Sequence, residues 1–132
     1  IRNEITAVIN YFDKPLVFNN NNIALRIRLI EKVFPNAKYI IADRERIFVA
    51  QSLLKARKIF FSDYDKWWSI MPKNYEELLK YPFVKQVVLQ HYNINKQMYL
   101  DLTNLVDKLN YKTIMYKDLC LNKELIFCRL GN

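Results

Sequence analysis

The stretch YIIADRERIFVAQSLLKAR, residues 39–57, decides the predicted fold. It opens with a short apolar run, Tyr39 to Ala42, whose β-forming residues are typical of a strand buried on both faces. A helical spacing follows over residues 46–57, with apolar side chains at Ile47, Ala50, Leu53 and Leu54. This succession predicts a β-α unit in which residues 43–45 form the polar turn.

Upstream of this unit, the pattern predicts two helices with a strand between them. The first helix covers residues 1–12, a buried strand covers residues 15–18, and the second helix covers residues 23–34 and is ended by Pro35. The sequence starts at Ile1 already inside the amphipathic pattern of the first helix. We therefore expect it to be a piece of a longer protein.

Downstream, the pattern predicts three more helices and one strand. These are a short helix that opens at Asn74 and runs to about residue 81, a long helix from about 83 to 109, a strand at 113–116, and a last helix over 123–130 with Gly131 as its C-terminal cap. Strands that alternate with helices over short connections predict an α/β fold, with a parallel β-sheet flanked by helices on both faces.

The composition excludes several classes of protein. Apolar residues make up 52% of the chain and aromatic residues 14%, which excludes a disordered chain. No run of about 18 apolar residues is present that would cross a membrane, so we expect a soluble domain. The single glycine, Gly131, excludes both a G-x-G-x-x-G loop and a G-x-x-x-x-G-K loop. Any phosphate site must be built in another way.

An excess of positive charge favours an anionic partner. The 132 residues include 21 Lys and Arg against 13 Asp and Glu, which gives a net charge of +8. Residues 26–58 hold nine basic and three acidic side chains, so they carry +6 of this excess. Such a balance suits a nucleotide, a nucleic acid, an acidic polymer or a membrane surface.

Residues that bind metals are scarce. The chain has two cysteines, Cys120 and Cys128, and one histidine, His91, which lack the number and spacing of a structural zinc site. We expect no metal, and we expect two buried free thiols, which are compatible with a cytoplasmic location. His91 falls in the long predicted helix near Val87 and Asn95, where we expect a packed or rim residue.

Arg44 is the leading candidate for binding an anion. Ligands of an open parallel sheet bind beyond the carboxyl ends of its strands, and Arg44 lies at such an end. The helix that starts just after it offers free N–H groups and the positive end of a dipole, which suit a phosphate. The guanidinium can add a two-pronged charged hydrogen bond. Ser52 lies about two turns into that helix and reaches the same anion only if the helix packs alongside it.

The sequence around these two residues resembles the central segment of sulfotransferases that use 3′-phosphoadenosine 5′-phosphosulfate (PAPS). The resemblance is carried by FPNAKYI at residues 34–40, Asp43-Arg44 and Ser52-Leu53-Leu54. In that family the strand-end arginine and the helix serine bind the 3′-phosphate of the donor, so the resemblance implies this role for Arg44 and Ser52. It also implies the family's P-loop-like α/β fold, incomplete at its N-terminus.

The resemblance extends over nearly the whole chain, to bacterial sulfotransferases of the carbohydrate and tyrosyl-protein type. It is carried by WWSIMP at residues 67–72, Glu77-Leu78-Leu79, Gln86, Asp101-Leu102, YKDL at residues 116–119 and the closing Leu130-Gly131. The family's Tyr-Glu-Asp-Leu places its tyrosine at a strand end against the nucleotide. The resemblance therefore implies that the Tyr116 ring stacks on adenine.

Two departures from the family concern the transfer step. Asn19 stands where relatives of the tyrosyl-protein type carry a lysine that stabilises the transferring sulfuryl group. Lys14 lies at the wrong end of the predicted strand to replace it, and we interpret it as a surface charge. The phosphosulfate-binding loop, a strand-loop-helix with Gly, Ser and Thr, is absent from these residues. We name no catalytic base, because no residue here matches the base of either branch of the family.

Together these patterns predict a partial sulfotransferase domain over residues 1–132, comprising its 3′-phosphate-binding and C-terminal portion. We expect transfer of a sulfuryl group from PAPS to a hydroxyl or amine, with a carbohydrate as acceptor and without nucleic acid, and an isolated chain that is inactive. Two alternatives stay open, a non-catalytic basic domain that binds nucleic acid or an acidic polymer, and a degenerate sulfotransferase paralogue. Trp67 and Trp68 are interpreted as core packing, with a stacking platform for a sugar as the alternative.

Overall fold

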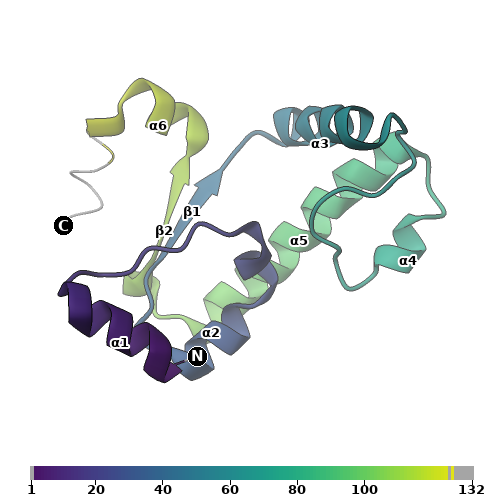
Figure 1. Cartoon of the computed structure of the whole chain (residues 1–132). Helices are drawn as coiled ribbons and strands as arrows, with labels where there is room; N and C mark the ends of the chain where they lie inside the picture. The colour runs from purple at the N-terminus through teal and green to yellow at the C-terminus, as the bar shows by residue number, and fades with distance from the viewer. Residues whose placement is uncertain (1, 125, 127–132) are drawn as a thin grey trace.

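The computed structural model of the chain describes residues 2–124 and 126, which form a mixed α/β structure (Figure 1). The elements in chain order are α1 (Arg2–Phe12), η1 (Asn21–Leu25), α2 (Ile27–Val33), β1 (Tyr39–Asp43), α3 (Arg46–Phe61), α4 (Tyr75–Leu78), α5 (Phe83–Leu105), η2 (Lys108–Asn110), β2 (Tyr111–Met115) and α6 (Tyr116–Leu121). Within the described ranges, no helix combines the length and the apolar character needed to cross a membrane.

The two strands form a parallel pair, as the sequence predicts. Tyr39 lies opposite Tyr111, and the register runs without a slip to Asp43 opposite Met115. A parallel pair needs a long crossover between its strands, and α3, α4 and α5 supply it. Both strands point the same way in Figure 1, so their carboxyl ends meet at one edge of the sheet.

Only one face of this sheet is packed, so the prediction of a strand buried on both faces is wrong. Exposure alternates along β1, and Ile40 remains 59% exposed. The packed face rests on a buried cluster from α2, α5 and the residue after α5, which consists of Ile27, Leu102 and Val106. Apolar residues on both faces of a strand do not by themselves provide a second covering layer, and the described residues do not cover the Ile40 face.

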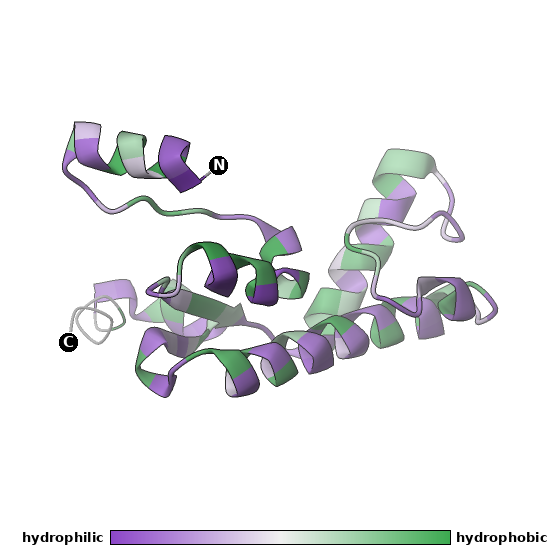
Figure 2. Cartoon of the chain, turned by 90° about the horizontal axis from the view of Figure 1, so that it is seen from below, coloured by the Kyte–Doolittle hydropathy of each residue, from purple (hydrophilic) through white to green (hydrophobic). Residues whose placement is uncertain are grey.

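The predicted strand at residues 15–18 is also wrong. These residues have no regular secondary structure and are all exposed, with Val17 at 85%. A strand needs a neighbour to satisfy its backbone groups, and Pro15 lacks one of the donors it would offer. Figure 2 shows the result, with α1 at the edge of the molecule and joined to η1 by this segment. None of the residues described in α1 is buried.

Most helices agree with the sequence pattern in place but differ in their ends, whereas the pattern does not predict α6. Its first residue, Tyr116, is expected to end the last strand, but β2 runs over Tyr111–Met115 and α6 begins directly after it. The predicted helix over residues 23–34 is divided into η1 and α2 by Arg26, whose φ of −125° and ψ of 14° lie outside the helical region. α3 continues four residues beyond the predicted end at residue 57, and α5 stops four residues short of the predicted end at 109. The predicted helix over residues 123–130 and its cap at Gly131 lie largely outside the described residues.

A buried arginine joins α3 to α5. Arg57 is 0% exposed, and its Nη1 donates hydrogen bonds to the carbonyl oxygen of Tyr64 at 2.9 Å and to Gln86 Oε1 at 2.7 Å. Its guanidinium carbon also lies 5.0 Å from the centroid of the Trp67 ring. Arg57 is therefore a buried residue that stabilises the packing of α3 against α5. Its charge does not contribute to the basic surface that the composition predicts.

The two neighbouring tryptophans pack against aromatic side chains. Trp68 stacks on Phe60 of α3 with ring centroids 4.2 Å apart, and Trp67 meets Tyr75 edge-on at 4.7 Å. Both indoles are half-buried. These contacts favour the core-packing interpretation, because the tryptophan rings pack against other side chains of this protein and are less available to stack on a sugar.

Candidate functional site

Arg44 lies at the carboxyl end of β1, in the turn that leads into α3. Its backbone N–H donates to Asp43 Oδ1 at 2.8 Å. α3 begins two residues later at Arg46 and runs for 16 residues. Sequence reasoning therefore placed Arg44 correctly, at a strand end and next to a helix N-terminus.

The register of the sheet brings Arg44 to Tyr116. Asp43 pairs with Met115, so the residues that follow each strand emerge side by side. The guanidinium carbon of Arg44 lies 5.2 Å from the centroid of the Tyr116 ring and 5.7 Å from that of Phe48. Attraction between a cation and an aromatic ring holds the guanidinium in this position. The sequence indicates both strand ends, but only the pairing register shows that they meet.

Arg44 forms no ion pair with a described residue, although Asp43 and Glu45 flank it in the sequence. Its side chain is exposed, and across residues 2–124 and 126 no carboxylate lies within ion-pair distance of it. A hydrogen bond with Cys120, one turn into α6, raises the pKa of the Tyr116 phenol, and the positive charge of Arg44 opposes that rise. Tyr116 therefore stays a neutral phenol near pH 7. The pair presents one cation and one polar aromatic ring to solvent.

A hollow of about 420 Å³ opens beside Arg44, between the strand ends and α5. Its walls consist of Asp43, Arg44, Glu45, Arg46, His91, Tyr92, Asn95, Lys96, Tyr99 and Met115. We call it the strand-end hollow. Its charged lining includes the cations Arg44, Arg46 and Lys96 and the carboxylates of Asp43 and Glu45. The described residues contain no group of three or more His, Cys, Asp or Glu side chains placed to hold a metal ion.

His91 lines the strand-end hollow although it lies 47 positions after Arg44 in the sequence. Asn95 Nδ2 lies 3.2 Å from His91 Nε2, and because an amide nitrogen only donates, Nε2 accepts this hydrogen bond. Burial lowers the pKa of His91, with Asp43 opposing this shift and Arg46 adding to it. His91 is thus the rim residue that its helical position predicts, but its proximity to Arg44 has no signal in the sequence.

Ser52 does not join this site. It is exposed on α3 and is not among the residues that line the strand-end hollow. It lies six residues after the start of the helix, which at 1.5 Å per residue is about 9 Å along the axis. Figure 1 shows α3 running away from the strand ends. The structure thus brings Arg44 and Tyr116 together and leaves Ser52 apart from them.

Comparison of the chain with protein-family models, with curated proteins and with solved structures found no match. The resemblance to sulfotransferases therefore stays a prediction from the sequence. The structure supports only a more general statement. The chain is mixed α/β and contains a parallel pair of strands, and Arg44 and Tyr116 follow the carboxyl ends of these strands.

Proposed function

We propose that this chain is the nucleotide-binding portion of a PAPS-dependent sulfotransferase. The observation that supports this proposal is the Arg44 guanidinium held 5.2 Å from the Tyr116 ring, at the edge where two parallel strands end and α3 begins. In open α/β sheets this edge is the usual place for a ligand. A cation beside a helix N-terminus suits a phosphate, and an aromatic ring beside it suits a base.

Arg44 and Tyr116 have complementary parts in this proposal. The guanidinium donates two parallel hydrogen bonds to the 3′-phosphate of the nucleotide, which a lysine in its place would not reproduce. Tyr116 is 45% exposed, so part of its ring is accessible for stacking on adenine. Arg46 and Lys96 add positive charge on the two sides of the strand-end hollow. Ser52 contributes to the phosphate only if α3 shifts toward it on binding.

The acceptor of the proposed transfer is a hydroxyl or amine, with a carbohydrate favoured. Transfer also requires a positioned cation at the sulfuryl group and a base for the acceptor proton. Asn19 offers an amide in place of the family's lysine, and an amide donates a hydrogen bond without neutralising charge. We therefore expect this chain alone to bind the nucleotide and not to transfer the sulfuryl group.

Calorimetry with adenosine 3′,5′-bisphosphate tests the proposal. The Arg44→Ala variant should bind this nucleotide at least about tenfold more weakly than the parent chain, because a charged hydrogen bond contributes about 1.5–3 kcal/mol. Arg26→Ala is the matched control, since Arg26 is also exposed within the basic segment but lies away from the strand ends. It should leave the affinity unchanged.

The same titrations separate the alternatives. A basic domain that binds nucleic acid by charge alone would tolerate the loss of Arg44, show no preference for the 3′-phosphate and lose affinity steeply with salt. A degenerate paralogue would bind the nucleotide through Arg44 and remain inactive even with a complete phosphosulfate loop. Equal affinities for the parent and Arg44→Ala would contradict the role proposed for Arg44.

A further inference from the structure

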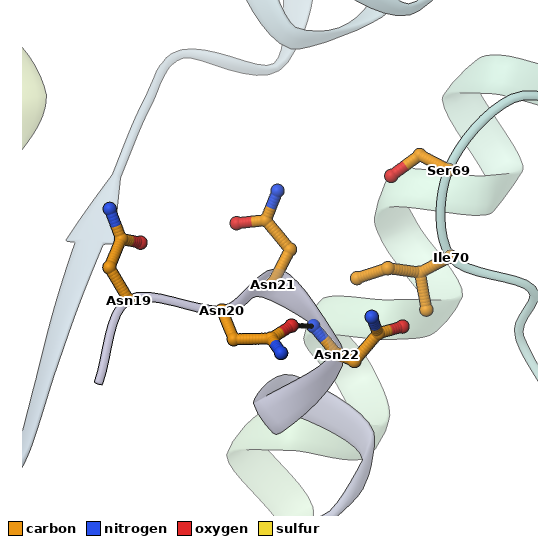
Figure 3. Close-up of a pocket in the computed structure, with 6 residues that line it drawn as sticks. All are labelled: Asn19, Asn20, Asn21, Asn22, Ser69 and Ile70. Carbon is orange, nitrogen blue, oxygen red and sulfur yellow. Dashed lines mark hydrogen bonds between the residues drawn. The ribbon is translucent and has the colours of Figure 1, made fainter.

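A second hollow has a volume of about 450 Å³, and no charged side chain lines it. Its walls consist of the four asparagines Asn19 to Asn22, together with Ser69 and Ile70 (Figure 3). We call it the asparagine hollow. Its lining shares no residue with the strand-end hollow, and its uncharged amides differ from the charged side chains there.

Most of the amides in the asparagine hollow are unused. Asn20 Oδ1 accepts a hydrogen bond from the backbone N–H of Asn22 at 2.9 Å and caps η1. The side-chain amides of Asn19, Asn21 and Asn22 make no hydrogen bond to any residue between 2 and 124 or to 126. Each of these three amides therefore offers two donors and one acceptor to a ligand.

The opposite wall is held by hydrogen bonds from a buried amide. Gln90 of α5 is 1% exposed, and its Nε2 donates to the carbonyl oxygens of Trp68 at 2.8 Å and Ile70 at 2.9 Å. The residue between those two carbonyls, Ser69, has a φ of 71°, which is a strained value for a residue with a side chain. Figure 3 shows its hydroxyl directed toward the side of the hollow where Asn21 lies.

We propose that the asparagine hollow binds the uncharged hydroxyl groups of a carbohydrate. Sugar hydroxyls donate and accept hydrogen bonds at once, as the free amides and the Ser69 hydroxyl do. The half-buried Ile70 side chain provides apolar surface for the C–H face of a sugar ring. No cation lines the hollow, which disfavours a phosphate or a sulfate as the group bound there.

This inference rests on the proposed function for one point only, the role of the sugar as the acceptor of the sulfuryl group. Binding itself depends on residues of the asparagine hollow and not on Arg44. Asparagine side chains also have few rotatable bonds, so little conformational entropy is lost when a ligand fixes them. The hollow thus adds to the proposal a location at which the sugar binds.

The test is an NMR titration of the ¹⁵N-labelled chain with cellobiose, maltose and lactose as neutral probes. At least one of them should shift the side-chain amide signals of the four asparagines in a saturable manner. The double variant Asn21→Ala/Asn22→Ala should lose at least about tenfold in affinity, because two amides that each make a net hydrogen bond of about 1 kcal/mol are removed. Asn104→Ala, an exposed asparagine at the far end of α5, should behave as the parent.

A second variant protects the test against misfolding. Ser69→Gly keeps the positive φ without strain and removes the hydroxyl, so it should fold normally and bind the sugar more weakly. The absence of saturable shifts with all three sugars, or equal affinities for the parent and the double variant, would overturn the inference. Adenosine 3′,5′-bisphosphate titrated in parallel distinguishes the two proposals, because Arg44→Ala should lose the nucleotide and keep the sugar.

Discussion

The strand-end hollow and the asparagine hollow are built in opposite ways. The first is formed by the ends of β1 and β2 and by one side of α5, and charged side chains line it. The second is formed by the residues just before η1, by the first two residues of η1 and by the irregular segment before α4, and amides line it. Both therefore offer polar groups to a ligand, but they suit ligands of different charge.

The difference shows how each site is supported. Under the strand-end hollow lies the sheet, which packs on Ile27, Leu102 and Val106. The loops of the asparagine hollow are held by side-chain hydrogen bonds, because Gln90 donates two to the Ser69 loop and Asn20 accepts one from the backbone N–H of Asn22 at the start of η1. A substitution in the core should therefore affect the first site through the stability of the whole sheet, whereas a substitution of Gln90 should affect the second site alone.

The largest effect should come from Leu102→Ala. Leu102 is fully buried beneath the sheet, and its truncation should lower the free energy of unfolding by about 3 kcal/mol because it removes apolar contacts and leaves a cavity. Val17→Ala, in the exposed segment after α1, should change it by less than about 0.5 kcal/mol. Chemical denaturation followed by circular dichroism measures both. Similar losses in the two variants would contradict the described difference in packing.

A smaller effect, confined to one hollow, is expected for Gln90→Leu. The change keeps the volume of the side chain but removes both hydrogen bonds to the Ser69 loop. Their loss should lower the free energy of unfolding by about 2 kcal/mol. Sugar binding should be lost while adenosine 3′,5′-bisphosphate still binds. Gln51→Leu, on the exposed face of α3, is the control. Loss of nucleotide binding in the Gln90 variant would show that the two hollows are not independent.

The smallest expected effect is the contribution of His91 to the pH dependence of the free energy of unfolding. Burial lowers the pKa of His91 in the folded chain, so the unfolded chain binds a proton more readily. The stability associated with a neutral His91 is therefore present above the ordinary pKa of about 6.5 and is lost as the pH falls below it. His91→Gln should flatten this part of the profile of unfolding free energy against pH. An unchanged slope in the variant would mean that His91 is not held neutral in the strand-end hollow.

The sequence predicts the elements whose signals are local. β1 and α3 follow from an apolar run and a helical spacing in adjacent residues, and Arg44 is placed correctly because it lies where the two patterns meet. The strand predicted at residues 15–18 has the same local signal but no partner strand among the described residues. Strand pairing depends on distant residues, and a short apolar run does not reveal whether they are present.

The composition of the two hollows depends on distant contacts for the same reason. Arg44 meets Tyr116 because of the register between β1 and β2, and His91 lines the same hollow as Arg44 because α5 passes beside the strand ends. Four consecutive asparagines predict a turn, but they do not predict that Ser69, in the loop to which Gln90 donates, lines the same hollow. The spacing of residues in the sequence does not predict which side chains from distant segments line each hollow.

The most direct measurement follows the NMR signals of the Arg44 side-chain Nε–H and the Tyr116 ring during a titration with adenosine 3′,5′-bisphosphate. Binding of the 3′-phosphate by Arg44 and of adenine by Tyr116 should shift both sets of signals together, with one dissociation constant, while the signals of the asparagine side chains stay in place. Shifts at other basic residues that leave the signals of Arg44 and Tyr116 unmoved would contradict the account.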